Sequence, residues 1–258
     1  DVVVTAGALE AITLSLLALT RPGDAVMVES PTYYGLLQAI AARGLKVVEI
    51  PVCCDEGPDL ECALKALATQ PIRAAVLIPS FSNPSGAQMP MAARRTLAQA
   101  CARQGVPVIE DDVYGELAFD GSRPSPLMSH DEGDNVILCG SASKIIGPGL
   151  RMGWAVSPRW REALLRAKAF TSIAANTLSQ HVTAELLTGA NLERPLRRLR
   201  SEGLSIVFVT HFLNQVYAVS DRITVLRNGS WVGEWLAKDL GPQALIAAML
   251  GRDMAAAS

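Results

Sequence analysis

Short apolar runs alternate with helix-length segments between residues 2 and 157, and this alternation restricts the fold more than any other feature. The runs are apolar at successive positions, as expected for strands that are covered on both faces. Several segments between them repeat apolar residues with helical spacing. The expected strands are residues 2–5, 25–29, 46–52, 74–79, 107–111, 136–139 and 153–157, and the expected helices include 8–19, 34–43, 60–68 and 91–103.

This order of elements predicts an α/β fold, a three-layer sandwich in which helices cover a mostly parallel sheet. The 258 residues suffice for one large domain, or for one domain with an appendage. In such a sheet, ligands bind beyond the carboxyl ends of the strands. The loops that follow the strands are therefore where functional residues are expected.

Charge and composition exclude some classes of partner. The formal net charge is -2, which gives no electrostatic footprint for nucleic acid or for an anionic membrane. The most apolar stretch, residues 2–19, contains Glu10 together with threonines and serines and is too polar for a membrane span. The five cysteines form no C-x-x-C pair, and their odd number does not fit a disulfide framework, so reduced thiols and a cytoplasmic location are expected.

Loops after the first, second and fourth expected strands carry candidate ligand contacts. Gly7 would let the backbone approach a ligand closely, and the amides at the start of the following helix favour an anion. Tyr33 is suited to stacking on a planar ring, and Asn83 can donate a hydrogen bond to a ligand oxygen. Each of these residues also fits an ordinary turn or packing role, and the individual motifs leave both readings open.

Three acidic residues, Glu110, Asp111 and Asp112, end the fifth expected strand and are followed by Tyr114. Carboxylates at the end of a buried strand are unfavourable unless a cation pairs with them. A protonated ring nitrogen, a metal ion or a lysine would each serve. The cluster contains no histidine, so a zinc site is not expected, and we assign no metal ligands.

The sixth expected strand leads into the segment GSASK at residues 140–144, followed by GPGLR at 147–151. Lys144 is flanked by small hydroxyl residues and glycines at the ligand end of the sheet, which is unusual for a solvated surface lysine. A desolvated lysine can form a Schiff base with a carbonyl compound. Arg151 supplies a planar fork that suits a phosphate group.

Taken in order, these loops resemble the fold-type I aminotransferases, which depend on pyridoxal phosphate. The matching pattern is Thr-x-Gly, Pro-x-Tyr, Asn-Pro-x-Gly, Asp-x-x-Tyr, Ser-x-x-Lys and then Arg. The segments VIEDDVYGEL and GSASKIIGPGLRMGW are most similar to the aminotransferase-like domain of GntR-type transcriptional regulators, the MocR group. The resemblance covers about residues 1–198, and it implies the large cofactor-binding domain of that fold.

The resemblance also implies a role for each matching residue. Lys144 is the catalytic lysine that bonds to the cofactor and later transfers protons. Asp111 pairs with the pyridine nitrogen, and Asp112 is expected to be structural. The other implied cofactor contacts are Tyr114 and Asn83 at the ring hydroxyl, Tyr33 stacked on the ring, and Gly7, Ala8, Ser141 and Arg151 around the phosphate.

The remainder of the chain departs from that family. From about residue 197 to residue 253 it resembles the end of an ABC transporter ATPase of the sugar-importer kind, with a strand at 205–210, the switch histidine His211, the segment SDRITVLRNG and a terminal helix. No G-x-x-x-x-G-K-[ST] loop is present, so ATP turnover is not expected. We therefore expect two domains, 1–198 and 199–258, joined as a chimera, with the second forming a small α/β tail.

These observations predict a pyridoxal-phosphate-binding, aminotransferase-like domain that handles an amino acid or amine. An enzyme moving amino groups between an amino acid and a 2-oxo acid is one reading, with little turnover because the substrate-holding small domain is not recognisable. A cofactor-sensing effector domain of a GntR-type regulator is another, and a nonfunctional fusion fragment is a third. The chain starts at Asp1 on a strand-like run, which indicates a piece of a longer protein. The resemblance further implies a homodimer.

Overall fold

The computed structural model describes residues 1–53, 56–118, 122–131, 133–188, 216–217, 220–227 and 229–251. The chain divides into two compact units, Asp1–Glu185 and Leu186–Ser258.

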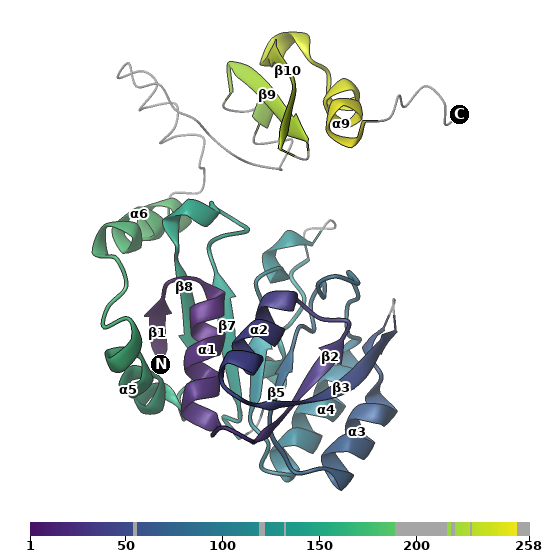
Figure 1. Ribbon diagram of the computed structural model, residues 1–258, viewed down its shortest axis with the longest axis vertical. Helices are drawn as coiled ribbons and strands as arrows, with labels where there is room; N and C mark the ends of the chain where they lie inside the picture. The colour runs from purple at the N-terminus through teal and green to yellow at the C-terminus, as the bar shows by residue number, and fades with distance from the viewer. Residues whose placement is uncertain are drawn as a thin grey trace. The chain divides into compact units, whose positions relative to one another are not determined.

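The first unit is built on an eight-stranded sheet with the order β1-β8-β7-β6-β5-β2-β3-β4 (Figure 1). Strand β8 runs antiparallel to β1 and β7, while β3, β2, β5, β6 and β7 are mutually parallel. The carboxyl ends of β1, β2, β5, β6 and β7 therefore share one edge. The strands are β1 Val2–Thr5, β2 Ala25–Ser30, β3 Lys46–Cys53, β4 Gly57–Pro58, β5 Ile72–Leu77, β6 Val108–Asp111, β7 Val136–Ser141 and β8 Gly153–Val156.

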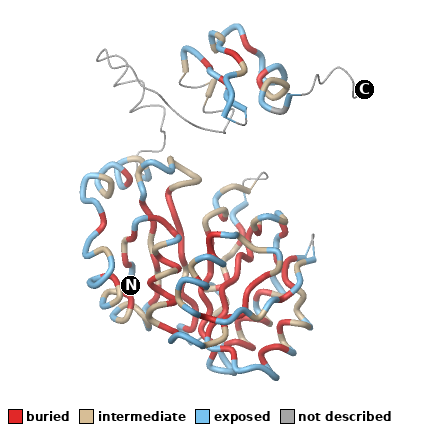
Figure 2. The backbone as a smooth tube through the Cα atoms, viewed as in Figure 1, coloured by how far each residue is buried: buried red, intermediate tan, exposed pale blue. Residues whose placement is uncertain are grey.

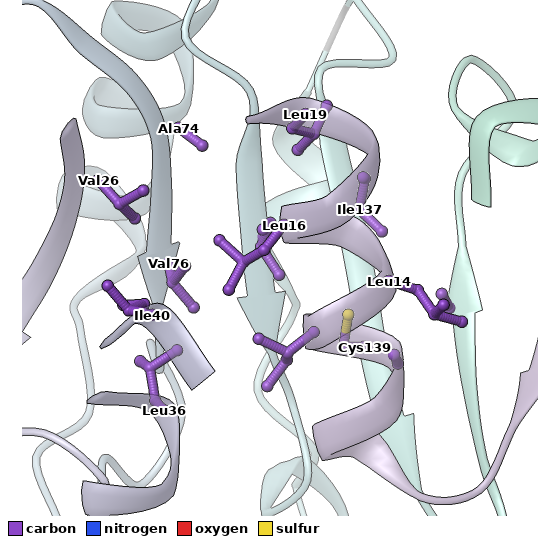
Figure 3. Packing of buried hydrophobic residues seen from close by; sticks show 14 of the residues in the cluster. Leu14, Leu16, Leu19, Val26, Leu36, Ile40, Ala74, Val76, Ile137 and Cys139 are labelled. Carbon is purple, nitrogen blue, oxygen red and sulfur yellow. The ribbon is translucent and has the colours of Figure 1, made fainter. Parts of the chain in front are cut away.

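Helices cover both faces of this sheet, which confirms the predicted three-layer α/β fold. One buried cluster joins α1 (Ala8–Leu19), α2 (Tyr34–Ala42) and α5 (Arg161–Thr171) to the sheet, and a second joins α3 (Leu60–Thr69) and α4 (Met91–Arg103) to the other face. Figure 3 shows side chains of α1 and α2 lying against those of β2, β5 and β7. Helix α6 (Thr177–Thr188) follows α5.

The central strands alternate between the two clusters, as side chains of period two require. On β5, Val76 belongs to the α1 side and Leu77 to the α4 side; on β6, Ile109 and Val108 divide in the same way. Figure 2 shows burial concentrated on the sheet, with the outer faces of the helices exposed. Burial on both faces explains why these strands are apolar throughout the sequence.

Most of the predicted strands differ from the observed ones by one or two residues at one end or both, and two strands depart from their predicted form for a physical reason. Strand β5 ends at Leu77 instead of residue 79, because the backbone amide of Ile78 donates to the carboxylate of Glu29 at 2.7 Å. Strand β3 is largely exposed and buries Ile50 alone, because its outer neighbour is only the two-residue strand β4. The mostly apolar composition of β3 therefore predicts a strand, but it does not imply that helices cover both faces of that strand.

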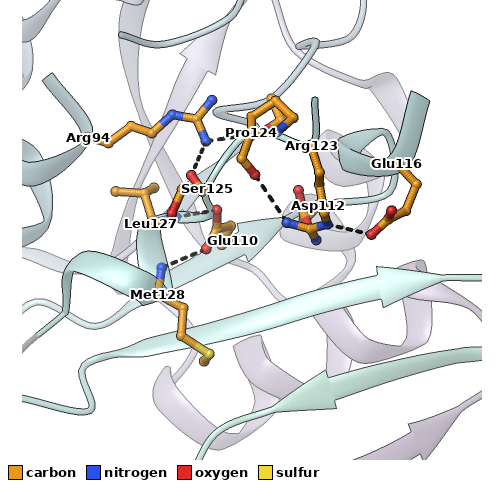
Figure 4. A network of polar contacts seen from close by, with 10 residues as sticks. Arg94, Glu110, Asp112, Glu116, Arg123, Pro124, Ser125, Leu127 and Met128 are labelled. Carbon is orange, nitrogen blue, oxygen red and sulfur yellow. Dashed lines mark hydrogen bonds and ion pairs between the residues drawn. The ribbon is translucent and has the colours of Figure 1, made fainter. Parts of the chain in front are cut away.

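A buried arginine ties together the loops that leave β5 and β6 (Figure 4). The Arg94 guanidinium, on α4, is 1% exposed and donates to the backbone oxygens of Met89, Pro79 and Ser125 at 2.6–2.8 Å, and to Ser80 Oγ at 3.0 Å. Nearby, Glu110 accepts from two amides at the start of the 3-10 helix Leu127–His130. These bonds hold the segment that carries Asn83 against the main sheet.

Replacing Arg94 with methionine is expected to lower the free energy of unfolding by about 3–5 kcal/mol, because several buried carbonyl oxygens would lose their donor. The neighbouring Arg95 is exposed, so Arg95→Met is a matched control that should change stability by less than about 0.5 kcal/mol. Urea unfolding monitored by far-ultraviolet circular dichroism measures both. Equal midpoints for the two variants would contradict a structural role for Arg94.

The second unit contains a β-hairpin and a helix. Strands β9 (Arg222–Arg227) and β10 (Ser230–Leu236) pair antiparallel, and α9 (Pro242–Leu250) packs on them through Ile223, Val225 and Leu245. Helix α9 corresponds to the terminal helix that the sequence predicts. The predicted strand at 205–210, His211 and the junction near residues 194–202 lie outside the described residues.

Candidate functional site

A cavity of about 330 Å³ opens at the shared carboxyl edge of the sheet. It is lined by every residue that the sequence assigned to cofactor binding except Gly7, which lies against Arg151. The structure thus brings together loops that are up to 145 residues apart in the chain. The lining residues are Ala8, Leu9, Ile12, Tyr33, Tyr34, Ile78, Asn83, Asp111, Val113, Tyr114, Ser141, Ser143, Lys144 and Arg151.

Asp111 is the buried acid of the cavity. It ends β6, in register with Cys139 of β7, and is 7% exposed. Its Oδ1 atom has no hydrogen-bond partner among the described residues. Burial raises the pKa of the Asp111 carboxyl to about 7; a backbone hydrogen bond from Val113 opposes this, and the charges of Asp112 and Glu29 add to it. A cation placed at Oδ1 would remove much of this desolvation penalty.

Asp112 has a different environment, although it is the next residue. It does not line the cavity and instead forms an ion pair with Arg123, which also contacts Glu116 (Figure 4). Successive residues at a strand end point in opposite directions, so only one of the two acids faces the cavity. Asp111 therefore faces the cavity, whereas Asp112 is held in an ion pair outside it.

Lys144 and Tyr114 both line the cavity, and the Lys144 Nζ atom lies over the Tyr114 ring, 5.6 Å from its centre. A tight turn after β7 holds it: the amides of Ile146 and Gly147 both donate to the backbone oxygen of Ala142. Asn83 Nδ2 lies 3.4 Å from Tyr114 Oη, so these two side chains also converge. Burial, and secondly the charge of Asp111, raises the pKa of the Tyr114 phenol.

Tyr33 approaches from the loop after β2. It immediately precedes α2, and its ring stands edge-on to that of Tyr34, with 4.9 Å between centroids and 61° between planes. Both rings line the cavity. Tyr33 therefore contributes an aromatic ring to the lining of the cavity that also contains Asp111 and Lys144.

The other end of the cavity is suited to an anion. Gly7 has φ 93° and is the N-cap residue of α1. Since glycine has no side chain that could accept from the first amides of the helix, these amides are available to a ligand. Arg151 Nη2 donates to Ala6 O at 3.1 Å, which places the guanidinium beside the same amides. A side chain at Gly153 would lie 2.5 Å from the carbonyl carbon of Gly7, so β8 can approach this loop only with glycine there.

Ser141 completes that end. Its hydroxyl oxygen lies 2.9 Å from Met152 O and 2.8 Å from Ser143 Oγ, and it accepts from the Ser143 amide at 3.1 Å. Ser143 also lines the cavity and was not assigned from the sequence. Its place between Ser141 and Lys144 in the same loop was the available signal.

Glu29 is a further residue that the sequence reading missed. It is 1% exposed near the carboxyl end of β2 and accepts hydrogen bonds from the Ile78 amide and from Ser82 Oγ. Burial raises its pKa to about 7. Because Glu29 accepts the hydrogen bond from Ser82, it restrains the loop that contains Asn83. A carboxylate within the apolar run 25–29 was its signal in the sequence.

Among the described residues, no group of three or more histidine, cysteine, aspartate or glutamate side chains could hold a metal ion. Within the same residues, no helix is both long and apolar enough to cross a membrane. The four described cysteines are free thiols.

Comparison with known proteins assigns this chain to a family. The model of the family described as aminotransferase class I and II matches residues 1–212. Over 200 residues the chain is 38% identical to an HTH-type transcriptional regulator of Escherichia coli, covering 78% of this chain and 43% of the regulator. It is 32% identical to 2-aminoadipate transaminase of Thermus thermophilus, covering 99% of this chain and 65% of that enzyme. The chain thus spans 43% and 65% of the lengths of these two relatives.

Solved structures agree with the sequence comparison. The α-aminoadipate aminotransferase of Thermus thermophilus, crystallised with N-(5'-phosphopyridoxyl)-L-leucine, superposes with a TM-score of 0.70 at 34% identity, covering 78% of this chain and 52% of that one. The Pyrococcus horikoshii kynurenine aminotransferase gives a TM-score of 0.69 at 32% identity, covering 78% and 51%. Because the family model matches residues 1–212, the chain belongs to the aminotransferase class I and II family.

Proposed function

We propose that the cavity binds pyridoxal phosphate and that the chain is the cofactor-binding part of an aminotransferase-type protein. The observation that carries this proposal is the unpartnered Oδ1 of buried Asp111 in the same cavity as Lys144. A buried carboxylate oxygen without a hydrogen-bond partner favours a cationic ligand atom, such as a protonated pyridine nitrogen. The relative crystallised with a phosphopyridoxyl compound supports the same ligand class.

The remaining residues fit the other parts of that ligand. Tyr33 would stack on the ring, and Asn83 and Tyr114 would bond the ring hydroxyl. Arg151, Ser141 and the backbone of Gly7 and Ala8 would hold the phosphate. Lys144 would bond to the aldehyde carbon and carry protons to and from the substrate.

When bound, pyridoxal phosphate supplies a protonated ring that accepts electron density from the substrate. The chain contributes the charge that keeps the ring protonated, through Asp111, and the amine, through Lys144. Ile78 and Val113 add apolar side chains to the lining that Tyr33 shares. The test is a titration of the full chain with pyridoxal phosphate, which should produce a saturable visible absorption band distinct from that of the free cofactor.

A second candidate function is sensing. Several relatives are HTH-type transcriptional regulators, and the first two are from Escherichia coli. In that role an amino acid or amine would alter the cofactor band without sustained amino transfer. The sequence upstream of Asp1 in the encoding gene separates the candidates, because a basic winged-helix segment would favour the regulator.

Transaminase turnover by this chain is expected to be low, below roughly one thousandth of an ordinary kcat of about 10 per second. Catalysis needs the substrate Cα–H held close to the lysine and aligned with the ring, and the chain has only part of the length of its enzyme relatives. A coupled assay with a panel of amino acids and 2-oxoglutarate measures the rate. Ordinary turnover with any of them would contradict this expectation.

We also propose that residues 1–198 and 199–258 have separate origins, the second being an ABC ATPase fragment. The segment SDRITVLRNG and the small core of β9, β10 and α9 support this proposal. The alignment of 2-aminoadipate transaminase over 99% of the chain favours one continuous origin instead. An isolated 199–258 peptide that folds, measured by circular dichroism, would support independence.

We further propose that the chain forms a homodimer and that it is located in the cytoplasm. The free thiols support the cytoplasmic location.

A further inference from the structure

The loop after β1 is held at both backbone polar groups of Ala6. On one side Arg151 Nη2 donates to the Ala6 oxygen at 3.1 Å. On the other side the Ala6 amide donates to the Glu10 carboxylate, one turn further along the chain. Ala6 precedes Gly7 and Ala8, so these two bonds determine where the free amides at the start of α1 point. Glu10 does not itself line the cavity.

Glu10 has a disadvantage in this position. A carboxylate in the first turn stabilises the helix through its dipole. The same partial positive charge attracts an anionic ligand, so an uncompensated Glu10 would compete with and repel a phosphate bound there.

A buried lysine from another helix offsets this charge. Lys168 of α5 is 6% exposed, and its Nζ atom lies 3.5 Å from Glu10 Oε2, the oxygen that accepts from Ala6. Nζ also donates to Ser172 Oγ at 2.8 Å. Packing of Leu164 in the cluster shared with α1 fixes α5 at the distance this pair requires. A buried ammonium needs such partners, and here it has two.

We propose that Glu10 and Lys168 are positioning residues for the phosphate end of the cavity. Glu10 orients the Ala6 peptide, and Lys168 cancels the charge of Glu10, so that the helix start and Arg151 present a net positive field to the ligand. This inference rests on the proposed binding of pyridoxal phosphate. It predicts that the pair affects binding of the phosphate group of the ligand and does not affect binding of the ring.

The experiment compares binding of pyridoxal phosphate with binding of pyridoxal, which has the same ring and aldehyde but no phosphate. Lys168→Met in the full chain should weaken pyridoxal phosphate binding roughly tenfold, by leaving Glu10 uncompensated near the anion, and change pyridoxal binding less than about twofold. The double variant Glu10→Gln/Lys168→Met, which removes both charges and keeps an acceptor for Ala6, should recover most of the lost affinity. Arg166→Met, at an exposed position of α5, is the matched control and should behave as wild type.

The outcomes separate this inference from the function on which it rests. Absence of pyridoxal phosphate binding by the wild-type chain would overturn both. Wild-type binding with an unaffected Lys168→Met variant would overturn this inference alone, and so would an equal loss for pyridoxal, which would indicate a general structural defect. A double variant that binds pyridoxal phosphate no better than Lys168→Met would also overturn this inference alone. If Lys168→Met does not fold, Lys168→Gln removes the same charge while retaining a donor for Ser172.

Discussion

The Lys144→Ala variant is expected to form no visible absorption band with pyridoxal phosphate, although the wild-type chain should form one. Among the described residues that line the cavity, Lys144 is the only lysine. It lies in a turn outside the buried hydrophobic clusters. Removing a loop lysine that contributes little to core burial should change the free energy of unfolding by less than about 1 kcal/mol. The loss of the band would therefore reflect lost chemistry and not a lost fold.

Borohydride reduction followed by peptide mapping gives an independent measurement. The reduced wild-type chain should carry the pyridoxyl label on the peptide containing Lys144, and Lys65→Ala, an exposed position on α3, should label normally. Label on a different lysine, with Lys144 unmodified, would show that the assignment is wrong. The cavity itself would then have to be reconsidered as the cofactor site.

Asp111→Ala is expected to weaken binding of pyridoxal phosphate by at least about thirtyfold, because the variant removes one partner of a buried charge pair. Asp112→Ala is the matched comparison. It should retain cofactor binding while losing stability, since it leaves Arg123 without one of its two acidic partners. Isothermal titration with parallel thermal unfolding distinguishes the two effects. The reverse pattern would mean that the acid facing the ring has been assigned one residue out of register.

The pH dependence provides a second measurement on the same residue. In the free protein, burial raises the pKa of Asp111 to about 7, and pairing with a cation would favour its ionised form. Binding is then linked to proton release, so the affinity of the wild-type chain should fall as pH decreases below about 7. This part of the pH dependence should be absent from Asp111→Ala. Glu29 and Glu110 titrate in a similar range and remain in both proteins, so the comparison isolates Asp111.

The sequence alone sufficed for the fold class and for most of the cavity. Strands buried on both faces leave continuous apolar runs, and the residues at their carboxyl ends fall on one edge whatever the details of packing. The motifs after the strands made Lys144, Asn83, Asp111 and Tyr114 candidates, and the family resemblance of the loops taken in order gave each of them its predicted role. Alternation of side chains along a strand requires that only one of Asp111 and Asp112 faces the cavity. The three-residue step from Asp111 to Tyr114, which matches the family pattern, selected Asp111.

Only the tertiary structure decided which distant charges meet. Glu29 with Ser82, Arg94 with Ser125, and Glu10 with Lys168 join segments that are 53, 31 and 158 residues apart. Nothing in the sequence near any of these residues specifies its partner. A buried charge acquires its partner from helix and loop packing, and packing depends on the summed contacts of the whole core and not on any one motif. The sequence by itself thus determined the strands, the layers and the loops that meet at the cavity, whereas the buried pairs that hold those loops in place were decided by the assembled fold.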